Sequence, residues 1–522
     1  MKLRLAPVTL AALVFAIAGC GDDSGSDGGD PAALAPPRSL IFIEGTVRPS
    51  GETKTNVDAI ASRVAGVDSL GALIVEELES MSREENEPID FEKDVEPWLG
   101  DRAGYFFQTI EDGDPSDGGA VIEATDGETA AAFVEKVADQ SEDPVAEGSY
   151  EGVEYRIDES PDPSVYGVVG DHLVIGEDEA TFKAVVDASE GEGLDDVDRY
   201  DEAISAASEA SLADVYVDIG GLIRQSEGEI DVGAQQAFDS VGIDPSDATA
   251  VASVIPGKDQ VEIEISSDLA GEEPPEGDAS ELIGSMPADS LAAIGFSGFG
   301  EQVREALETL DEQGIPGEIP PNQLKKGLKQ SGIDLDGIVG SLGDAAVFAS
   351  GSSERTVGGA LVLTTEDPQQ ASNTVSNIGL LLRSAGTAGV TAIGGNTEGF
   401  SIRSDDLGDR PIAIATKGDR LAIGYGVAPT LRGLAAGGRT LDQNPDYKDA
   451  VAALGETSIS GFVDGRAALR LVDSLMRTSA DREDRAEFRR ARRYLRSISS
   501  VAIGTERSGD LAVARLIVSL DG

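Results

Sequence analysis

The chain has very few of the side chains that usually build metal sites and nucleophilic active sites. Its 522 residues include one cysteine, one histidine and one tryptophan, and only 5% of them are aromatic. A structural zinc site needs about four cysteine or histidine ligands, so the composition excludes that class. The sequence also contains no Walker A motif and no Gly-x-Ser-x-Gly motif. We therefore expect no cofactor.

Basic residues are also few. The chain contains 40 lysines and arginines against 97 acidic residues, and its formal net charge is −57. A charge of this sign repels nucleic acids and anionic lipid surfaces, so neither a nucleic-acid partner nor simple electrostatic adhesion to a membrane is expected. The acidity is also explained by solubility alone. The apolar fraction of 40% supplies enough material for hydrophobic cores, and the length predicts two or more domains.

The first twenty residues have the pattern of an export signal. Lys2 and Arg4 precede an apolar run over residues 10–18, which is too short to span a bilayer as a helix. The following residues 17–20, Ile-Ala-Gly-Cys, resemble the lipobox of bacterial lipoproteins. That resemblance implies cleavage after Gly19 and lipidation of Cys20, including palmitate or a similar acyl chain. The alternative is cleavage by the ordinary signal peptidase, which leaves a free thiol.

These features predict a protein held on the cell membrane by a lipid and facing the extracytoplasmic side. Residues 1–19 are the predicted lipoprotein signal peptide. Residues 20–37 are rich in Gly, Asp and Pro and are predicted to be a disordered tether. No later segment has 18 unbroken apolar residues, so no transmembrane helix is expected.

The remaining chain has an internal repeat with an offset of 243 to 248 residues. The strongest pair of blocks is Gly-Asp-His-Leu-Val-Ile-Gly at 170–176 and Gly-Asp-Arg-Leu-Ala-Ile-Gly at 418–424. Leu-Gly-Asp at 99–101 likewise returns at 342–344, and Tyr-Val-Asp at 216–218 returns as Phe-Val-Asp at 462–464. We therefore predict a first repeat over 38–270 and a second over 271–522, joined by a Gly/Glu/Pro linker near 271–277.

Each repeat combines strand patterns with helix patterns. Short apolar runs bounded by Gly-Asp turns predict antiparallel strands, for example over residues 165–176. Helical spacing begins after Asp126 and after Asp367, where Pro368 takes the first helical position. The predicted fold class is α+β, with two tandem homologous lobes that each contain an antiparallel sheet backed by helices.

The repeated Gly-Asp-x-Leu hairpin, the Leu-Gly-Asp block and the Val-Asp strand end resemble the bacterial extracytoplasmic proteins with "domain of unknown function 3352". The resemblance covers nearly all of the mature chain. It implies a duplicated architecture and an envelope location, and it implies no activity, cofactor or catalytic residue.

Two charged segments are candidate sites. Asp112, Asp114, Ser116 and Glu123 have the spacing of a calcium loop, but Asp117 occupies the position of the required glycine. We therefore expect an acidic hairpin loop and no metal, with a calcium site as the alternative. The second candidate, a docking surface for the acidic first repeat, lipid headgroups or a wall polymer, contains Arg489, Arg490, Arg492 and Arg493. The favoured interpretation of this segment is a solvated helix whose arginines pair with Asp481, Glu483, Asp484 and Glu487.

The other candidates favour structural roles. His172 follows a turn aspartate, so we expect an exposed turn residue instead of a catalytic base. Gly424-Tyr425-Gly426 lacks the third glycine of a phosphate loop and is interpreted as a tight turn. Asp218 and Asp464 each follow a strand and are predicted to cap helices.

The sequence therefore predicts a non-catalytic, lipid-anchored binding or scaffolding protein. Its expected partners are the membrane, through the anchor, and an unknown protein or cell-envelope ligand. Two alternatives remain open: an envelope hydrolase that uses a pair of carboxylates, and a carrier of lipids or other hydrophobic ligands.

Overall fold

The computed structural model describes residues 29–72, 75, 89–111, 114–141, 143–160, 163–225, 245–269, 278–313, 325–326, 329, 335–395, 397–403, 410–435, 438–478, 482–509 and 511–521. The chain forms two compact units. The first comprises Met1–Glu272 with Glu506–Ala514 and Leu520–Gly522, and the second comprises Glu273–Thr505 with Arg515–Ser519. The linker expected near 271–277 lies outside the described residues. Both units mix helices with antiparallel strands, which confirms the α+β class.

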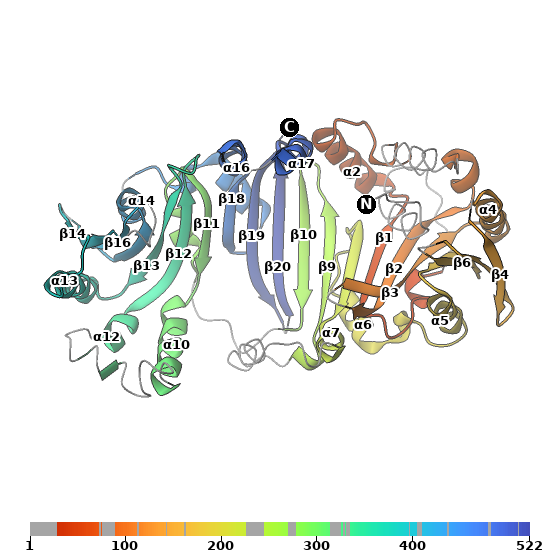
Figure 1. The fold of residues 1–522 in the computed structure, drawn as a ribbon, viewed down its shortest axis with the longest axis horizontal. Helices are drawn as coiled ribbons and strands as arrows, with labels where there is room; N and C mark the ends of the chain where they lie inside the picture. Colours follow the sequence, from red (N-terminus) through yellow and green to blue (C-terminus); the bar gives the residue numbers. More distant parts are fainter. Residues whose placement is uncertain are drawn as a thin grey trace. The chain divides into compact units, whose positions relative to one another are not determined.

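The first unit contains a strongly twisted series of antiparallel strands (Figure 1). Neighbouring strands pair in the order β10-β9-β8-β1-β2-β3-β7-β6-β5-β4. The strands are β1 (Ile41–Thr46), β2 (Leu99–Glu111), β3 (Asp114–Ala124), β4 (Val145–Tyr150), β5 (Val153–Asp158), β6 (Ser164–Val169), β7 (His172–Gly176), β8 (Ala213–Asp218), β9 (Thr249–Pro256) and β10 (Gln260–Ser267).

Helices of the first unit lie against both faces of this sheet. They are η1 (Pro31–Ala33), α2 (Gly51–Val64), η2 (Phe91–Val95), α4 (Gly127–Gln140), α5 (Glu179–Glu190), η3 (Leu194–Asp196), α6 (Asp198–Ile204), α7 (Ile219–Gln225) and η4 (Pro245–Asp247). Successive residues of a strand point to opposite faces. Tyr105 of β2 therefore packs with Phe133 of α4, whereas Phe106 packs with Phe182 of α5.

The prediction of a disordered tether over residues 20–37 is wrong from Asp30 onward. Asp30 caps η1 by accepting a hydrogen bond from the backbone amide of Ala32, and Ala32 and Ala35 are fully buried. Pro31 stands near the start of this short helix, where its fixed φ is favourable. Residues from Asp30 onward thus belong to the first unit, and residues 20–28 lie outside the described part.

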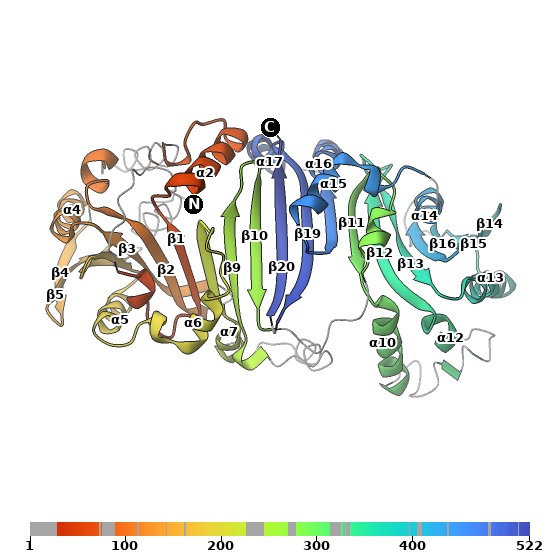
Figure 2. The same cartoon turned by 180° about the vertical axis from the view of Figure 1, so that it is seen from behind.

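The second unit contains its own antiparallel series, in the order β19-β18-β11-β12-β13-β17-β16-β15-β14 (Figure 2). The strands are β11 (Ser290–Phe296), β12 (Leu342–Ser350), β13 (Gly358–Thr365), β14 (Val390–Ile393), β15 (Glu398–Ile402), β16 (Ile412–Lys417), β17 (Arg420–Tyr425), β18 (Ile459–Asp464) and β19 (Ile498–Ser508). The last strand of the chain is β20 (Leu511–Leu520).

The helices of the second unit divide between two cores. They are α9 (Ser280–Gly284), α10 (Phe299–Gln313), α12 (Leu335–Val339), α13 (Pro368–Ser384), α14 (Val427–Gly433), η6 (Leu441–Gln443), α15 (Pro445–Ala453), α16 (Gly465–Thr478) and α17 (Arg482–Leu495). Phe348 packs with Ile283 of α9 and Tyr447 of α15 on one face, and Leu363 packs with Val375 of α13 on the other. Part of this second face is exposed.

Candidate functional site

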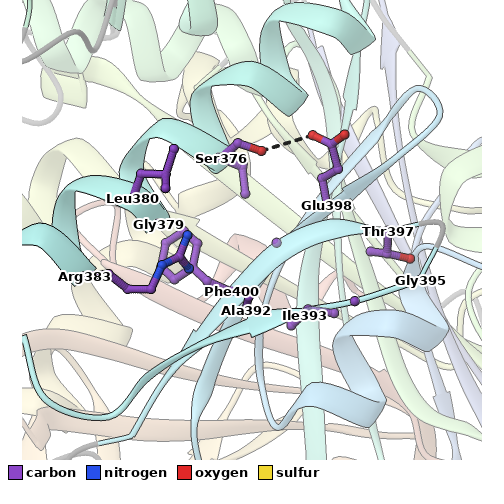
Figure 3. Close-up of a pocket in the computed structure, with 13 residues that line it drawn as sticks. Ser376, Gly379, Leu380, Arg383, Ala392, Ile393, Gly395, Thr397, Glu398 and Phe400 are labelled. Atoms are coloured by element: carbon purple, nitrogen blue, oxygen red, sulfur yellow. Dashed lines mark hydrogen bonds between the residues drawn. The ribbon is translucent and has the colours of Figure 1, made fainter.

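A pocket of about 310 Å³ lies between α13 and the hairpin β14–β15 of the second unit (Figure 3). The helix begins where Asp367 accepts a hydrogen bond from the backbone amide of Gln370, 3.0 Å away, and Pro368 occupies its first turn. Gly379 allows close approach to the hairpin, because a Cβ atom there would lie 2.9 Å from Cδ1 of Phe400. The sequence analysis predicted this helix but not the pocket.

The floor of the pocket is apolar and its rim is polar. Val375 and Phe400 are buried beneath it, while the Leu380 side chain is 57% exposed. Glu398 accepts hydrogen bonds from the hydroxyls of Ser372 and Ser376, the latter at 3.0 Å, and these bonds hold the pKa of Glu398 below its ordinary value. Glu398 is therefore a carboxylate at neutral pH.

Arg383 lines the same pocket from the last turn of α13 (Figure 3). It is exposed, and no described side chain forms an ion pair with it. Glu398 is the one carboxylate among the thirteen lining residues, so the pocket does not contain the pair of acids that glycoside hydrolysis uses. With one cationic group, one anionic group and an apolar floor, this pocket is suited to binding.

A second group of charges lies in the first unit. Arg102 of β2 forms ion pairs with Glu44 of β1 and with Asp30, the latter at 3.5 Å. Burial raises the pKa of Glu44 to about 7, and the neighbouring Arg102 charge opposes this rise. The group joins the N-terminal segment to two central strands.

The alternative of a calcium loop does not agree with the structure, in which β2 and β3 form a hairpin. Asp114 and Glu123 lie near opposite ends of β3, about 30 Å apart at the usual rise of a strand, and Asp112 lies outside the described residues. The hydroxyl of Ser116 is bonded to Thr109 at 2.7 Å. Glu123 is buried and accepts hydrogen bonds from the backbone amides of residues 101 and 102, both at 3.0 Å. Within the described residues, no cluster of three acidic, histidine or cysteine side chains could hold a metal ion.

His172 is also placed differently from the prediction of an exposed turn. It is 3% exposed, and its Nε2 lies 3.1 Å from the carbonyl oxygen of Gly29. Burial lowers the pKa of His172, which favours the neutral ring. The N-terminal segment lies against this ring, because a Cβ atom at Gly29 would be 3.0 Å from its Cε1, and the turn pattern alone did not reveal this contact.

The two repeated aspartates cap helices, as predicted. Asp218 accepts a hydrogen bond from the backbone amide of Gly221 at 2.7 Å, at the start of α7. Asp464 accepts one from the backbone amide of Ala467 at 2.7 Å, at the start of α16. Gly426 has a φ of 98° and directly precedes α14, which fits the tight turn expected there.

The predicted docking arginines do not form one uniform group. Arg492 forms a two-pronged ion pair with Asp473 of α16, whereas Arg489, Arg490 and Arg493 are exposed on α17. The structure thus assigns a structural role to one of the four. Cys20, the predicted lipidation site, lies outside the described residues.

Comparisons with known proteins place the chain in a family without assigning an activity. No described helix has the length and apolar character needed to cross a membrane. No curated protein matches the chain. Two solved structures, crystal forms III and I of TP0453, are 11% and 9% identical, with TM-scores of 0.28 and 0.25. These matches cover 49% and 47% of this chain and 86% and 79% of theirs.

The match to a family model covers more of the chain than the matches to solved structures. The model of the family described as "Protein of unknown function (DUF3352)" matches residues 71–464, which include most of both units. This match confirms the resemblance found in the repeated sequence blocks. The chain belongs to the DUF3352 family of proteins of unknown function.

Proposed function

We propose that this protein is a non-catalytic, lipid-anchored, extracytoplasmic binding protein built from two homologous lobes. The strand orders support the duplication, because β9-β8-β1-β2-β3-β7-β6-β5-β4 corresponds position by position to β19-β18-β11-β12-β13-β17-β16-β15-β14. Along the chain, the capped helix α4 lies between β3 and β4, and the capped helix α13 lies between the corresponding strands β13 and β14.

The anchor would hold the first unit close to the membrane. Eight residues separate Cys20 from Gly29, and Asp30 already caps η1. Such a segment reaches at most about 30 Å when fully extended. A Cys20→Ser variant should lose fatty-acid incorporation and leave the membrane fraction; retention of both would refute the anchor.

The pocket at α13 carries the proposed binding function. Ser376, which bonds Glu398, and Arg383 are seven residues apart, or about 10 Å along the helix axis. An extended peptide of three residues spans about the same length. The proposed ligand is a short apolar peptide whose carboxylate pairs with Arg383, whose amine pairs with Glu398 and whose side chains cover Phe400.

Trileucine tests this assignment directly. Its binding to the unlipidated mature chain should raise the midpoint of thermal unfolding, because a ligand stabilises the state that binds it. Arg383→Gln should weaken binding about tenfold, as expected for loss of a charge-assisted hydrogen bond. Arg355→Gln is the matched control, since Arg355 is exposed and does not line the pocket.

Blocked peptides identify the contact that each charge makes. C-terminal amidation should weaken binding to the wild type but not further weaken binding to Arg383→Gln. N-terminal acetylation should likewise weaken binding to the wild type but not further weaken binding to Glu398→Gln. If all three peptides bind equally, or if trileucine leaves the midpoint unchanged, the peptide assignment is wrong.

The hydrophobic-carrier alternative makes a different prediction. Its support is the apolar floor of the same pocket. Octanoate and octanol would then bind equally well, because the chain and not the charge would provide the free energy.

A further inference from the structure

Helices α16 and α17 form a basic region in an otherwise strongly acidic chain. Residues 465–496 contain ten arginines and five acidic residues, whereas the whole chain has a formal net charge of −57. All of the basic residues in this segment are arginines. Arginine presents a planar group of donors that matches the oxygens of a phosphate.

Two hydrogen-bonded contacts join α16 to α17. Nε and Nη2 of Arg492 donate to Oδ1 and Oδ2 of Asp473 at 2.7 and 2.8 Å, and this pairing holds the pKa of Asp473 below its ordinary value. Nε of Arg485 donates to the carbonyl oxygen of Met476 at 2.8 Å, near the end of α16. These two arginines therefore have internal roles.

Other arginines of α17 are exposed. Arg489, Arg490 and Arg493 project within about 100° of one another around the helix axis, at 100° per residue. All three are exposed. Together they form the arginine face of α17.

One exposed aromatic ring lies beside this face. Tyr494 is 37% exposed. The Arg493 guanidinium lies over the Tyr494 ring, 4.4 Å from its centroid. Tyrosine favours the boundary between lipid and water because its ring is apolar and its hydroxyl is polar.

We propose that the arginine face of α17 docks on the surface of an anionic phospholipid bilayer. The guanidinium groups would bind lipid phosphates, while Tyr494 would enter the headgroup region. The acidic remainder of the chain does not prevent this contact, because salt at physiological strength screens charges over about 8 Å. This second membrane contact is independent of both the lipid anchor and the peptide pocket.

Vesicle binding by the mature chain, residues 20–522 with Cys20→Ser, tests the proposal without the lipid. The vesicles contain phosphatidylcholine alone or with 30% phosphatidylglycerol. Binding should occur on the anionic vesicles at 0.1 M NaCl and should fall at least tenfold at 0.5 M NaCl or on neutral vesicles.

The decisive variant is Arg489→Gln/Arg490→Gln/Arg493→Gln, which should lose at least tenfold in vesicle affinity. Its control, Arg355→Gln/Lys417→Gln/Arg439→Gln, changes the net charge equally at exposed residues elsewhere in the same unit. The control should retain wild-type affinity within about twofold. Far-UV circular dichroism and the unfolding midpoint establish that both variants are folded.

Three results would overturn the proposal. The first is equal loss of affinity in the two triple variants, which would reflect net charge alone. The second is wild-type binding by the α17 variant. The third is binding to soluble polyglutamate without binding to anionic vesicles, which would identify a polyanion and not a lipid surface as the partner.

Discussion

Equivalent strand positions are buried in the first unit and exposed in the second. Residues that pair directly across antiparallel strands lie on one face of a sheet. The first unit has such a row in Ile43, Tyr105, Ala120 and Ile175, and the second unit has it in Ile294, Val347, Leu361 and Ile423. Tyr105, Ala120 and Ile175 are buried, whereas Ile294, Val347 and Ile423 are 38 to 47% exposed.

In the described residues, the segments that join the first two strands of the two units contribute differently to this face. Between β1 and β2, this segment supplies Phe91, Val95 and Trp98 to the core that contains Tyr105. The Trp98 ring also contacts Phe133 of α4, with centroids 5.4 Å apart. Between β11 and β12, the described residues supply Phe299 beside Leu342 and the α13 core. The two units therefore share one strand order, but different side chains cover the corresponding face of each sheet.

The largest expected effect comes from placing a charge at matched positions of the two rows. Ile175→Lys should lower the free energy of unfolding of the first unit by more than about 4 kcal/mol, because it buries an unpaired charge. Ile423→Lys should cost less than about 1 kcal/mol, because a lysine there reaches water.

Urea unfolding measures both variants. Trp98, the one tryptophan of the chain, reports on the first unit by fluorescence, and circular dichroism reports on both units. The two signals need separate fits, since two units need not unfold together. Equal losses in the two variants would show that the exposed row is covered in solution.

The next effect concerns pH. The pKa of Glu44 rises from its ordinary value of 4.5 to about 7 on burial, so the folded state holds this proton more tightly than the unfolded state. The stabilising contribution of the protonated carboxyl is complete below pH 4.5 and is lost as the pH rises toward 7. Above that range, Glu44→Gln should be more stable than the wild type by about 3 kcal/mol.

Trp98 fluorescence in urea between pH 4 and pH 8 measures this difference, which should vanish at pH 4. Gly295 occupies the matching position in β11, so no such titration is expected there. Glu398→Gln is a control with the opposite sign in the second unit. The lowered pKa of Glu398 gives stability that is present above its unfolded pKa and is lost as the pH falls. A pH-independent Glu44→Gln difference would contradict the burial effect.

The smallest expected effect concerns the N-caps of α4 and α13, where the two units should behave alike. Asp126 caps α4 by accepting hydrogen bonds from the backbone amides of residues 128 and 129, and Asp367 caps α13. Asp126→Ala and Asp367→Ala should each cost about 1 kcal/mol in the unit that contains them, measured by the same two signals. A cost in only one unit would break the equivalence of the two helices.

The helix starts and the turns could be predicted from the sequence because their causes are local. Asp126, Asp367 and Pro368 act within one helical turn of the residues that they cap or begin. Gly170 and Gly418, at the repeated Gly-Asp turns, have φ values of 58° and 60°, a conformation that glycine adopts without strain. The repeat of such signals also led to the correct family.

The pocket and the basic region required the folded structure to different degrees. The arginines of α17 were visible in the sequence, but only the position of Asp473 on α16 separates Arg492 from its exposed neighbours. The pocket depends on Gly379 meeting Phe400, two residues from separate elements whose packing leaves no periodic signal.

By itself, the sequence determined the α+β class, the capped helices, the tight turns and the absence of a zinc-binding composition. Each of these depends on residue type or on neighbours within a few positions. Only the tertiary structure decided that His172 and Ala35 are buried and that Ile423 is exposed. The physical reason is that burial depends on which distant segment packs over a side chain, and identical local patterns such as the two Gly-Asp hairpins can receive different coverage.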